Sequence, residues 1–256
     1  AILEDYAGNN KPGATIGVIK NGKLIFQKGY GMANLEAGVA NHPNVAYNIA
    51  SGSKQFTAAI IASLIQQNKL ALTDDIRKHI PQFKDYGKPL TIENLLYHTS
   101  GIRDYMVLMW LTGKSFEEPF TNKEAVDMIV QQEKLNFAPG DHCVYSNSNY
   151  ILLAEIIQRV TGTTLAEYAE KNLFKPVEMN GSGFDTGITE CASYRKIDTT
   201  YISFNNNYAA YGDGGMVTTL ADLVRVQATA LARARARGLD PDQPRHLTRA
   251  VHLPDA

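Results

Sequence analysis

Cysteine, excess charge and long apolar runs are all scarce in this chain of 256 residues. Its two cysteines, Cys143 and Cys191, are too few for a disulfide framework, and they could either pair or stay free. A net charge of −1 gives no electrostatic reason to expect nucleic acid or an anionic membrane surface as a partner. No apolar run approaches the roughly 18 residues that a transmembrane helix requires, so no membrane-spanning segment is expected. The 44% of hydrophobic residues predicts a globular protein with enough core for one or two domains.

Several motifs that define other enzyme classes are also missing. There is no Gly-x-Ser-x-Gly elbow, which argues against an α/β-hydrolase. There is no His-Glu-x-x-His, and the histidines show no metal-ligand spacing. No metal ion and no cofactor are therefore expected.

The order of strand-like and helix-like patterns predicts an α+β chain. Residues 14–28 contain two strand-like runs, and Asn21-Gly22 between them favours the tight turn of a β-hairpin. A large helical insert is expected over about residues 50–210, followed by a final helix from about Leu220. Within the insert, residues 56–67 are apolar nearly all round, which is typical of a buried helix.

Several helix ends in the insert can be predicted from local signals. Two threonines are each followed three residues later by a glutamate, which is the spacing of a capping box. These pairs are Thr121 with Glu124 and Thr164 with Glu167. Residues 149–161 are amphipathic and precede Gly162, so we expect a helix that stops at this glycine.

Two short motifs carry the chemistry of the chain. Ser51-Gly52-Ser53-Lys54 places a hydroxyl and an amine one helical turn apart, so both side chains can point the same way. Tyr145-Ser146-Asn147 can return a phenol and an amide to the same place. A serine hydroxyl is a poor nucleophile until a base takes its proton. Because burial disfavours a lysine ammonium and a nearby ammonium favours a phenolate, Lys54, Tyr145 or the pair sharing one proton could be that base.

Three less specific signals have structural interpretations. Ser51 alone could be a plain helix N-cap, a role that serine often fills. A second Ser-x-x-Lys, at Ser193-Tyr194-Arg195-Lys196, has no amphipathic helix after it and is expected on the surface. His98 could be mistaken for a catalytic base, but its setting favours a structural turn.

With these motifs, the chain resembles the serine β-lactamase and penicillin-binding-protein superfamily, in particular the branch of class C β-lactamases, D,D-peptidases and family VIII esterases. The resemblance spans about residues 6–222 and rests on four blocks in order. The blocks are Ile49-Ala50-Ser51-Gly52-Ser53-Lys54-Gln55-Phe56-Thr57, Leu95-Leu96-Tyr97-His98-Thr99-Ser100-Gly101-Ile102, Pro139-Gly140 leading into Tyr145-Ser146-Asn147-Ser148-Asn149-Tyr150, and Gly214-Gly215-Met216-Val217-Thr218-Thr219.

The resemblance implies a β-lactamase/transpeptidase-like fold, in which an antiparallel sheet with the N-terminal hairpin stands beside a large helical domain. It implies a serine hydrolase that forms an acyl-enzyme at Ser51, with Lys54 and Tyr145 as catalytic partners and Asn147 as a substrate-binding residue. The backbone N–H of Ser51 would supply one arm of an oxyanion hole. Expected substrates are a β-lactam, a D-amino-acid peptide or a small ester, and the expected location is periplasmic or secreted.

One element of the superfamily is not found in this sequence. Neither Lys-[Ser/Thr]-Gly nor His-x-Gly occurs, although the resemblance implies a strand that carries one of these motifs well after Gly215. Residues 223–256 instead form an Ala/Arg-rich tail without lysine, so we expect a hydrolase domain over residues 1–222. The tail could be an exposed helix with a solvated basic face, or it could replace lost C-terminal strands.

Missing strands would leave an open edge on the hairpin sheet, which a homo-oligomer could cover. The alternative function is then a catalytically impaired remnant or binding module that needs a partner to complete its sheet. The first residues, 1–7, resemble part of a helix, and no signal peptide is expected in the chain.

Overall fold

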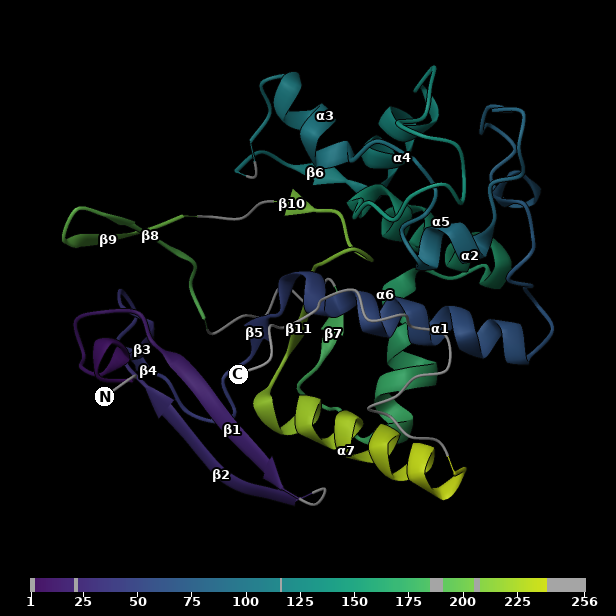
Figure 1. Cartoon of the computed structure of the whole chain (residues 1–256). Coiled ribbons are helices and arrows are strands. Elements are labelled where there is room, and N and C mark those ends of the chain that lie inside the picture. The colour runs from purple at the N-terminus through teal and green to yellow at the C-terminus, as the bar shows by residue number, and fades with distance from the viewer. Residues whose placement is uncertain (1–2, 21–22, 116, 185–190, 205–207, 239–256) are drawn as a thin grey trace, which may run out of the picture.

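Residues 3–20, 23–115, 117–184, 191–204 and 208–238 are described by the computed structural model of the chain, which is α+β (Figure 1). The strands are β1 (Ala14–Lys20), β2 (Lys23–Tyr30), β3 (Met32–Asn34), β4 (Val39–Ala40), β5 (Tyr47–Asn48), β6 (Phe120–Thr121), β7 (Gly183–Phe184), β8 (Tyr194–Ile197), β9 (Thr200–Ser203), β10 (Tyr208–Ala209) and β11 (Met216–Thr218). The helices are α1 (Lys54–Gln66), α2 (Ile92–Leu96), α3 (Tyr105–Leu111), α4 (Asn122–Val130), α5 (Asn147–Thr161), α6 (Leu165–Ala169) and α7 (Leu220–Ala236). Short 3-10 or π turns are η1 (Glu4–Tyr6), η2 (Ala50–Ser53), η3 (Ile76–Lys78), η4 (Glu170–Phe174) and η5 (Lys175–Val177).

The predicted N-terminal hairpin is confirmed. Strands β1 and β2 pair antiparallel from Ala14 opposite Tyr30 to Lys20 opposite Lys23, with an irregularity after Val18. The predicted Asn21-Gly22 turn lies outside the described residues. In the described part of the chain β1 and β2 form a sheet of their own, and the self-association expected at its edge stays a prediction.

A separate three-stranded antiparallel sheet supports the start of α1. Its order is β5-β11-β7, so the late strand β11 lies between two earlier ones. Backbone bonding continues past the sheet, because Ile49 N–H donates to the Met216 carbonyl at 2.9 Å. One pair elsewhere, β6 with β10, is parallel, so the sheets are not uniformly antiparallel.

The hydrophobic core lies in the helical region, where α1 and α5 contact each other and α5 also packs on α2, α4 and α6. The prediction that the α1 segment is buried all round is wrong along one strip. Ala59 and Ala62 are exposed on that strip, whereas Phe56 and Ile60 are buried. Alanine counts as apolar in a sequence pattern, but its single methyl group exposes little apolar area, so the pattern could not distinguish this side.

The predicted helix ends are confirmed by local hydrogen bonds. Thr121 and Thr164 each accept from the backbone three residues on, and the following glutamates complete both capping boxes. Helix α5 ends at Gly162, which has a left-handed φ of 72°. A third capping box, formed by Thr91 and Asn94 at α2, was not predicted because its third residue is asparagine.

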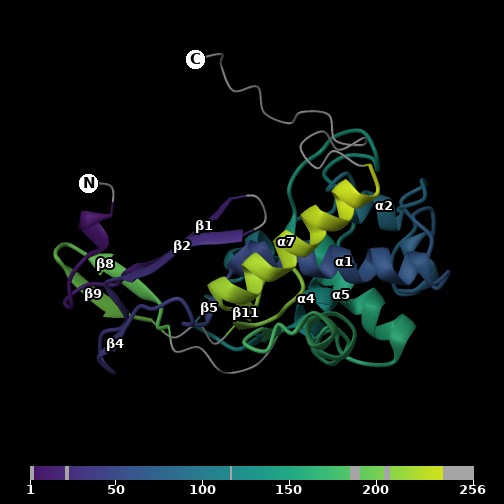
Figure 2. The same ribbon diagram turned by 90° about the horizontal axis from the view of Figure 1, so that it is seen from below.

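The predicted final helix is α7, and it lies beside β1 (Figure 2). Gly17 on β1 makes the approach possible, because a Cβ there would lie 2.9 Å from the Leu220 side chain. The predicted domain boundary after residue 222 falls inside α7, where Leu223 and Val226 pack against the core.

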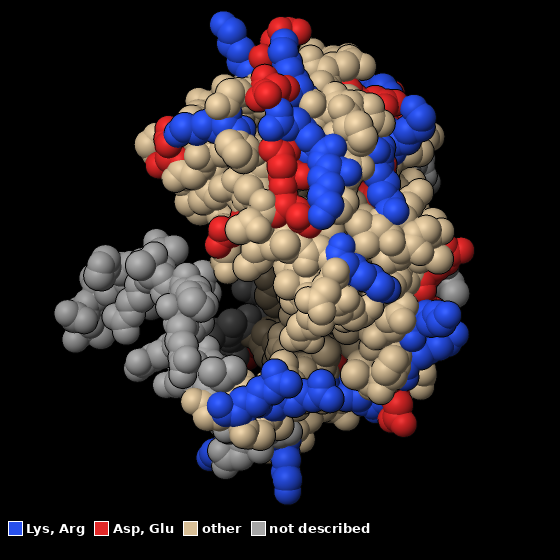
Figure 3. All heavy atoms as spheres, turned by 90° about the vertical axis from the view of Figure 1, so that its right-hand side faces the viewer, with Lys and Arg blue, Asp and Glu red and all other residues tan. Residues whose placement is uncertain are grey.

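The exposed side of α7 is basic. Arg225, Arg233 and Arg237 are exposed, and Lys and Arg side chains dominate the lower edge of the face in Figure 3, whereas both signs are mixed above it. One face of α7 therefore packs on the core while the other is exposed and basic, and whether this tail replaces lost C-terminal strands stays a prediction. Residues 239–256 lie outside the described part. Among the helices described, none combines the length and apolar character needed to cross a membrane.

We predict that Gly212→Ala destabilises the protein by about 2 to 6 kcal/mol, because backbone strain and overpacking each cost roughly 1 to 3 kcal/mol. Gly212 has a φ of +123°, and an added Cβ would lie 2.6 Å from the Ala154 Cβ. Gly162→Ala is the matched control, since its φ is also positive but nothing lies within 4 Å of the added Cβ. That control should lose about 1 to 2 kcal/mol. Urea unfolding followed by circular dichroism measures both losses, and equal losses would contradict the packing explanation.

Candidate active site

Ser51 lies in the η2 turn that immediately precedes α1. The turn is held by Ser53, whose hydroxyl donates to the Ala50 carbonyl at 2.6 Å and accepts from Met216 N–H at 3.0 Å. Ala50 takes a positive φ of 46°, so the residue before Ser51 has a strained backbone. The interpretation of Ser51 as a plain N-cap of α1 is wrong, because Ser53 occupies that position. Ser51 is exposed at the end of the helix where partial positive charge gathers.

Lys54 is the first residue of α1 and is nearly buried, with 7% of its surface exposed. Its ammonium group donates to Ser51 Oγ at 3.2 Å, Asn147 Oδ1 at 2.9 Å and the Asp213 backbone carbonyl at 2.5 Å. An ammonium group has three protons, so each proton has an acceptor here. The lysine is therefore held in one orientation, with Ser51 in reach.

Tyr145 completes the group around Ser51. Its hydroxyl donates to Ser51 Oγ at 2.8 Å, and 52% of the residue is exposed. The Lys54 Nζ atom lies 4.9 Å from the centre of the Tyr145 ring, within the range of a cation–π contact. The structure thus brings the four predicted site residues together at one place, since Asn147 meets them through Lys54.

Asn147 is oriented by Asp104, which no sequence motif marks. The Asp104 carboxylate accepts from the Asn147 side-chain amide at 2.9 Å and from its backbone N–H at 2.7 Å. Its other oxygen caps α3 by accepting from Met106 N–H. The Asn147 amide also donates to Met106 Sδ at 3.4 Å, so both its hydrogens have partners. Its predicted donation to substrate stays a prediction and requires that one of these bonds opens.

The His98 ring packs against the Tyr145 ring. Its Nδ1 accepts from Ser146 N–H at 3.2 Å and lies 3.0 Å from the Asn149 amide, so the neutral ring carries its proton on Nε2. The ring lies between Tyr145 and Tyr150, with centroid distances of 4.7 and 5.3 Å. Its φ of +56° agrees with the predicted structural turn. Burial and the nearby charge of Lys54 lower the pKa of His98.

A glycine-rich loop, residues 212–215, also contacts Lys54. The Gly212 carbonyl accepts from Thr57 at 2.7 Å, and Asp213 is buried, with 2% of its surface exposed. The Asp213 carboxylate accepts from the Tyr105 hydroxyl at 2.8 Å. Burial raises the pKa of Asp213 to about 6. Asp213 was not predicted as a site residue, because an aspartate between glycines is an ordinary loop signal.

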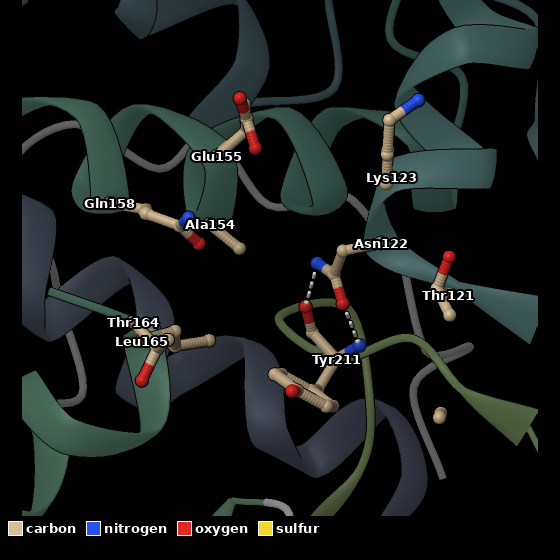
Figure 4. A pocket seen from close by; sticks show the side chains of 10 residues that line it. Thr121, Asn122, Lys123, Ala154, Glu155, Gln158, Thr164, Leu165 and Tyr211 are labelled. Carbon is tan, nitrogen blue, oxygen red and sulfur yellow. Dashed lines mark hydrogen bonds between the residues drawn. The ribbon is translucent and has the colours of Figure 1, made fainter.

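The residue before this loop, Tyr211, is anchored at a cavity of about 210 Å³ (Figure 4). There the Asn122 side chain accepts from Tyr211 N–H at 2.9 Å and donates to the Tyr211 carbonyl at 2.8 Å. Ala154 and Leu165 supply apolar lining. The loop that carries Asp213 is therefore fixed from two directions.

The remaining predictions concern residues away from the site. Ser193 and Lys196 lie in or next to the exposed strand β8, which confirms the expectation of a surface position. Cys143 and Cys191 are both free in the described structure. No group of three or more potential metal-ligating side chains occurs among the residues described.

The fold is that of serine β-lactamases and penicillin-binding proteins. A sequence model of the beta-lactamase family matches residues 1–255, and the chain belongs to that family. A D-aminopeptidase from Brucella canis is 32% identical over 229 residues, which are 88% of this chain and 43% of that protein. The protein Flp from Staphylococcus aureus is 36% identical over 191 residues, 72% of this chain and 37% of its own length.

Solved structures agree with this fold. The octameric penicillin-binding protein homologue from Pyrococcus abyssi superposes with a TM-score of 0.76 at 28% identity, covering 86% of this chain and 52% of that one. FmtA from Staphylococcus aureus superposes with a TM-score of 0.74 at 24% identity, covering 94% of this chain and 66% of its own. The chain thus spans less than half the length of the two sequence relatives and about half to two thirds of these structures.

We predict that Lys54→Met raises the pKa of His98 towards its ordinary value of 6.5, because the substitution removes one of the two causes that lower it. The measurement is a proton NMR titration of the His98 ring in wild type and variant. Because burial remains, the value should stay below 6.5. A His98 titration that does not change would show that Lys54 exerts no charge effect on the ring.

Proposed function

We propose that the chain is a serine hydrolase that acts through an acyl-enzyme at Ser51. The observation that carries this proposal is the pair of contacts at Ser51 Oγ, from Tyr145 Oη at 2.8 Å and from Lys54 Nζ at 3.2 Å. A nucleophile within hydrogen-bond reach of a base that is itself held in place is the arrangement that activates a serine.

The first half of the reaction forms the acyl-enzyme. Before the reaction, Tyr145 and Lys54 together carry one proton fewer than when both are fully protonated. This pair takes the proton of Ser51 as Oγ attacks the substrate carbonyl carbon. The carbonyl oxygen becomes an oxyanion, which the Ser51 backbone N–H stabilises at the start of α1. The tetrahedral intermediate collapses, the bond to the leaving group breaks, and the same pair returns the proton to that group.

The second half releases the acyl group to water. A water molecule gives a proton to the Tyr145 and Lys54 pair while its oxygen attacks the ester carbon. Ser51 Oγ then leaves and regains a proton from the pair, which restores the starting state. Water can reach this site, since Ser51 is exposed and half of Tyr145 is exposed.

For the substrate, we favour a peptide or amide of a D-amino acid over a small ester or a β-lactam. The support is the 32% identity with the Brucella canis D-aminopeptidase over 88% of this chain. Ester and β-lactam substrates use the same acyl-enzyme chemistry and therefore stay alternatives. A periplasmic or secreted location is likewise kept as a prediction.

The competing proposal is a catalytically impaired binding module of the same fold. The observation in its favour is that Lys-[Ser/Thr]-Gly and His-x-Gly do not occur in the 256 residues. Loss of one oxyanion-hole donor costs about 10²- to 10³-fold in rate. Such a loss slows acylation but leaves Ser51 able to react, so covalent labelling separates the two proposals better than turnover does.

We predict that Ser51→Ala abolishes covalent labelling by a chromogenic β-lactam, a p-nitrophenyl short-chain ester and a D-amino-acid p-nitroanilide. Ser193→Ala is the matched control, because it changes the serine of the second Ser-x-x-Lys and lies next to the exposed strand β8. Intact-mass spectrometry after mixing should show a stoichiometric adduct in wild type and in Ser193→Ala. A folded wild-type protein without any adduct would favour the binding module.

We predict that Tyr145→Phe lowers kcat/KM by about 10²- to 10⁴-fold, because a general base is typically worth that much. The phenylalanine keeps the ring that packs on His98, so positioning is preserved. Tyr150→Phe is the matched control, since its ring also lies near Lys54, at 5.7 Å, but its hydroxyl bonds to the Leu96 carbonyl. Equal losses in both variants, measured with the best substrate, would remove Tyr145 from the role of base.

A further inference from the structure

His98 holds the backbone on both sides of Tyr145. Its carbonyl accepts from Val144 N–H at 3.0 Å, and its Nδ1 atom accepts from Ser146 N–H at 3.2 Å. The positive φ of 56° at His98 is a backbone conformation that histidine and asparagine adopt more often than most residues do. Two hydrogen bonds to one residue therefore bracket Tyr145, whose hydroxyl donates to Ser51 Oγ at 2.8 Å.

A buried chain of hydrogen bonds fixes the acceptor role of His98 Nδ1. Ser100 Oγ accepts from Ile102 N–H at 3.1 Å and gives its own proton to Asn149 Oδ1 at 2.6 Å. The Asn149 oxygen is thus turned towards Ser100, so its amide nitrogen faces His98 Nδ1, at 3.0 Å, and donates to it. Ser100 and Asn149 are both buried. With Ser146 N–H as the second donor, Nδ1 has no place for a proton of its own.

Protonation of His98 would break this arrangement. A proton on Nδ1 turns the acceptor into a donor that faces two other donors. The Asn149 amide could turn over and offer its oxygen, but the backbone N–H of Ser146 cannot turn. Ser146 is buried, so its N–H would lose its acceptor where water cannot replace it. A charged His98 therefore releases the backbone directly after Tyr145.

The titratable groups that face His98 among the described residues come from three segments. Lys54 on α1 disfavours a second positive charge, whereas Asp104 at the N-cap of α3 favours one. The rings of Tyr145 and Tyr150, before and on α5, lie against the imidazole. Burial and then Lys54 outweigh Asp104, so the pKa of His98 lies below its ordinary value of 6.5. The ring is therefore neutral at neutral pH, as the two bonds to Nδ1 require.

We infer that His98 is a positioning residue that must stay neutral, because its unprotonated Nδ1 atom keeps the Tyr145 hydroxyl on Ser51. The inference rests on the proposed function, and it holds whichever member of the Tyr145 and Lys54 pair takes the proton. It assigns part of the acid limit of activity to a histidine outside that pair. A role in the turn alone would not depend on the protonation of the ring.

Two substitutions separate the acceptor from the ring. His98→Asn keeps an acceptor, since the asparagine Oδ1 can take the place of Nδ1, and this acceptor does not titrate. His98→Phe keeps a ring against Tyr145 but offers no acceptor to Ser146. His79→Asn is the matched control, because His79 is a second mostly buried histidine with a lowered pKa, and it lies next to Asp74 instead.

Two NMR measurements need no substrate. The nitrogen resonances of the His98 ring should show the proton on Nε2 at neutral pH, and their titration gives the pKa of the ring. Hydrogen exchange of Ser146 N–H should be slow in wild type and in His98→Asn, which both have the acceptor. The exchange should be faster in His98→Phe, because this N–H then has no acceptor.

The pH profile of activity measures the effect on the site. His98→Phe should lower kcat by about 10²-fold at neutral pH, since a displacement of about 1 Å near the reacting atoms can cost this much. His98→Asn should keep most of the activity. On acidification, kcat/KM of wild type relative to His98→Asn should fall with its midpoint at the His98 pKa. The same ratio taken with His79→Asn should stay constant while circular dichroism shows folded protein.

Three outcomes would overturn the inference. The first is a proton on Nδ1 of His98 at neutral pH, and the second is equal activity and equal Ser146 exchange in His98→Phe and His98→Asn. The third is a constant activity ratio of wild type to His98→Asn across the His98 titration. Should His98→Phe fail to fold, the first and third still decide. A protein with the expected tautomer and exchange but without Ser51-dependent turnover would refute the proposed function and leave the hold of His98 on Tyr145 in place.

Discussion

Burial of the Lys54 ammonium group is the constraint on which the rest of the site depends. A cation taken out of water needs a partner for every proton, and here the three acceptors come from η2, from the start of α5 and from the loop before β11. These segments are far apart in sequence, so the lysine can be satisfied only when the small sheet, the helical core and the glycine-rich loop are all in place. The site is in this sense a product of the whole fold.

The glycine-rich loop shows how the backbone meets that demand. Its carbonyl oxygens reach α1 because Gly212 and Gly215 take positive φ angles and approach neighbours that a Cβ would displace. Thr57 then ties the loop to α1 through its hydroxyl, and Ser53 ties η2 to the first residue of β11. Ala50, the first residue of η2, has a strained positive φ, and Ser51 next to it is exposed.

Local features of this chain could be predicted from sequence, whereas charge partners could not. The hairpin, the capping boxes at Thr121 and Thr164 and the stop at Gly162 each depend on a few neighbouring residues, so their signals survive in the sequence. The meeting of Ser51 with Tyr145 was expected from resemblance, because spacing alone cannot bring two distant motifs together. Asp104 and Asp213 were missed since each acts across the fold, where a loop aspartate has no distinctive pattern.

The roles of Asp104 and Asp213 differ because their hydrogen bonds differ. Asp104 accepts from two groups of Asn147 and caps α3, so its charge is offset by fixed dipoles and it mainly orients the amide. Asp213 has one hydrogen-bond partner for its carboxylate, the Tyr105 hydroxyl, and an oxygen with none among the described residues. An amide of the same shape would fit the same space with less loss of hydration. What Asp213 gives Lys54 by direct contact is its backbone carbonyl, so the backbone of the loop, and not this side chain, holds the lysine.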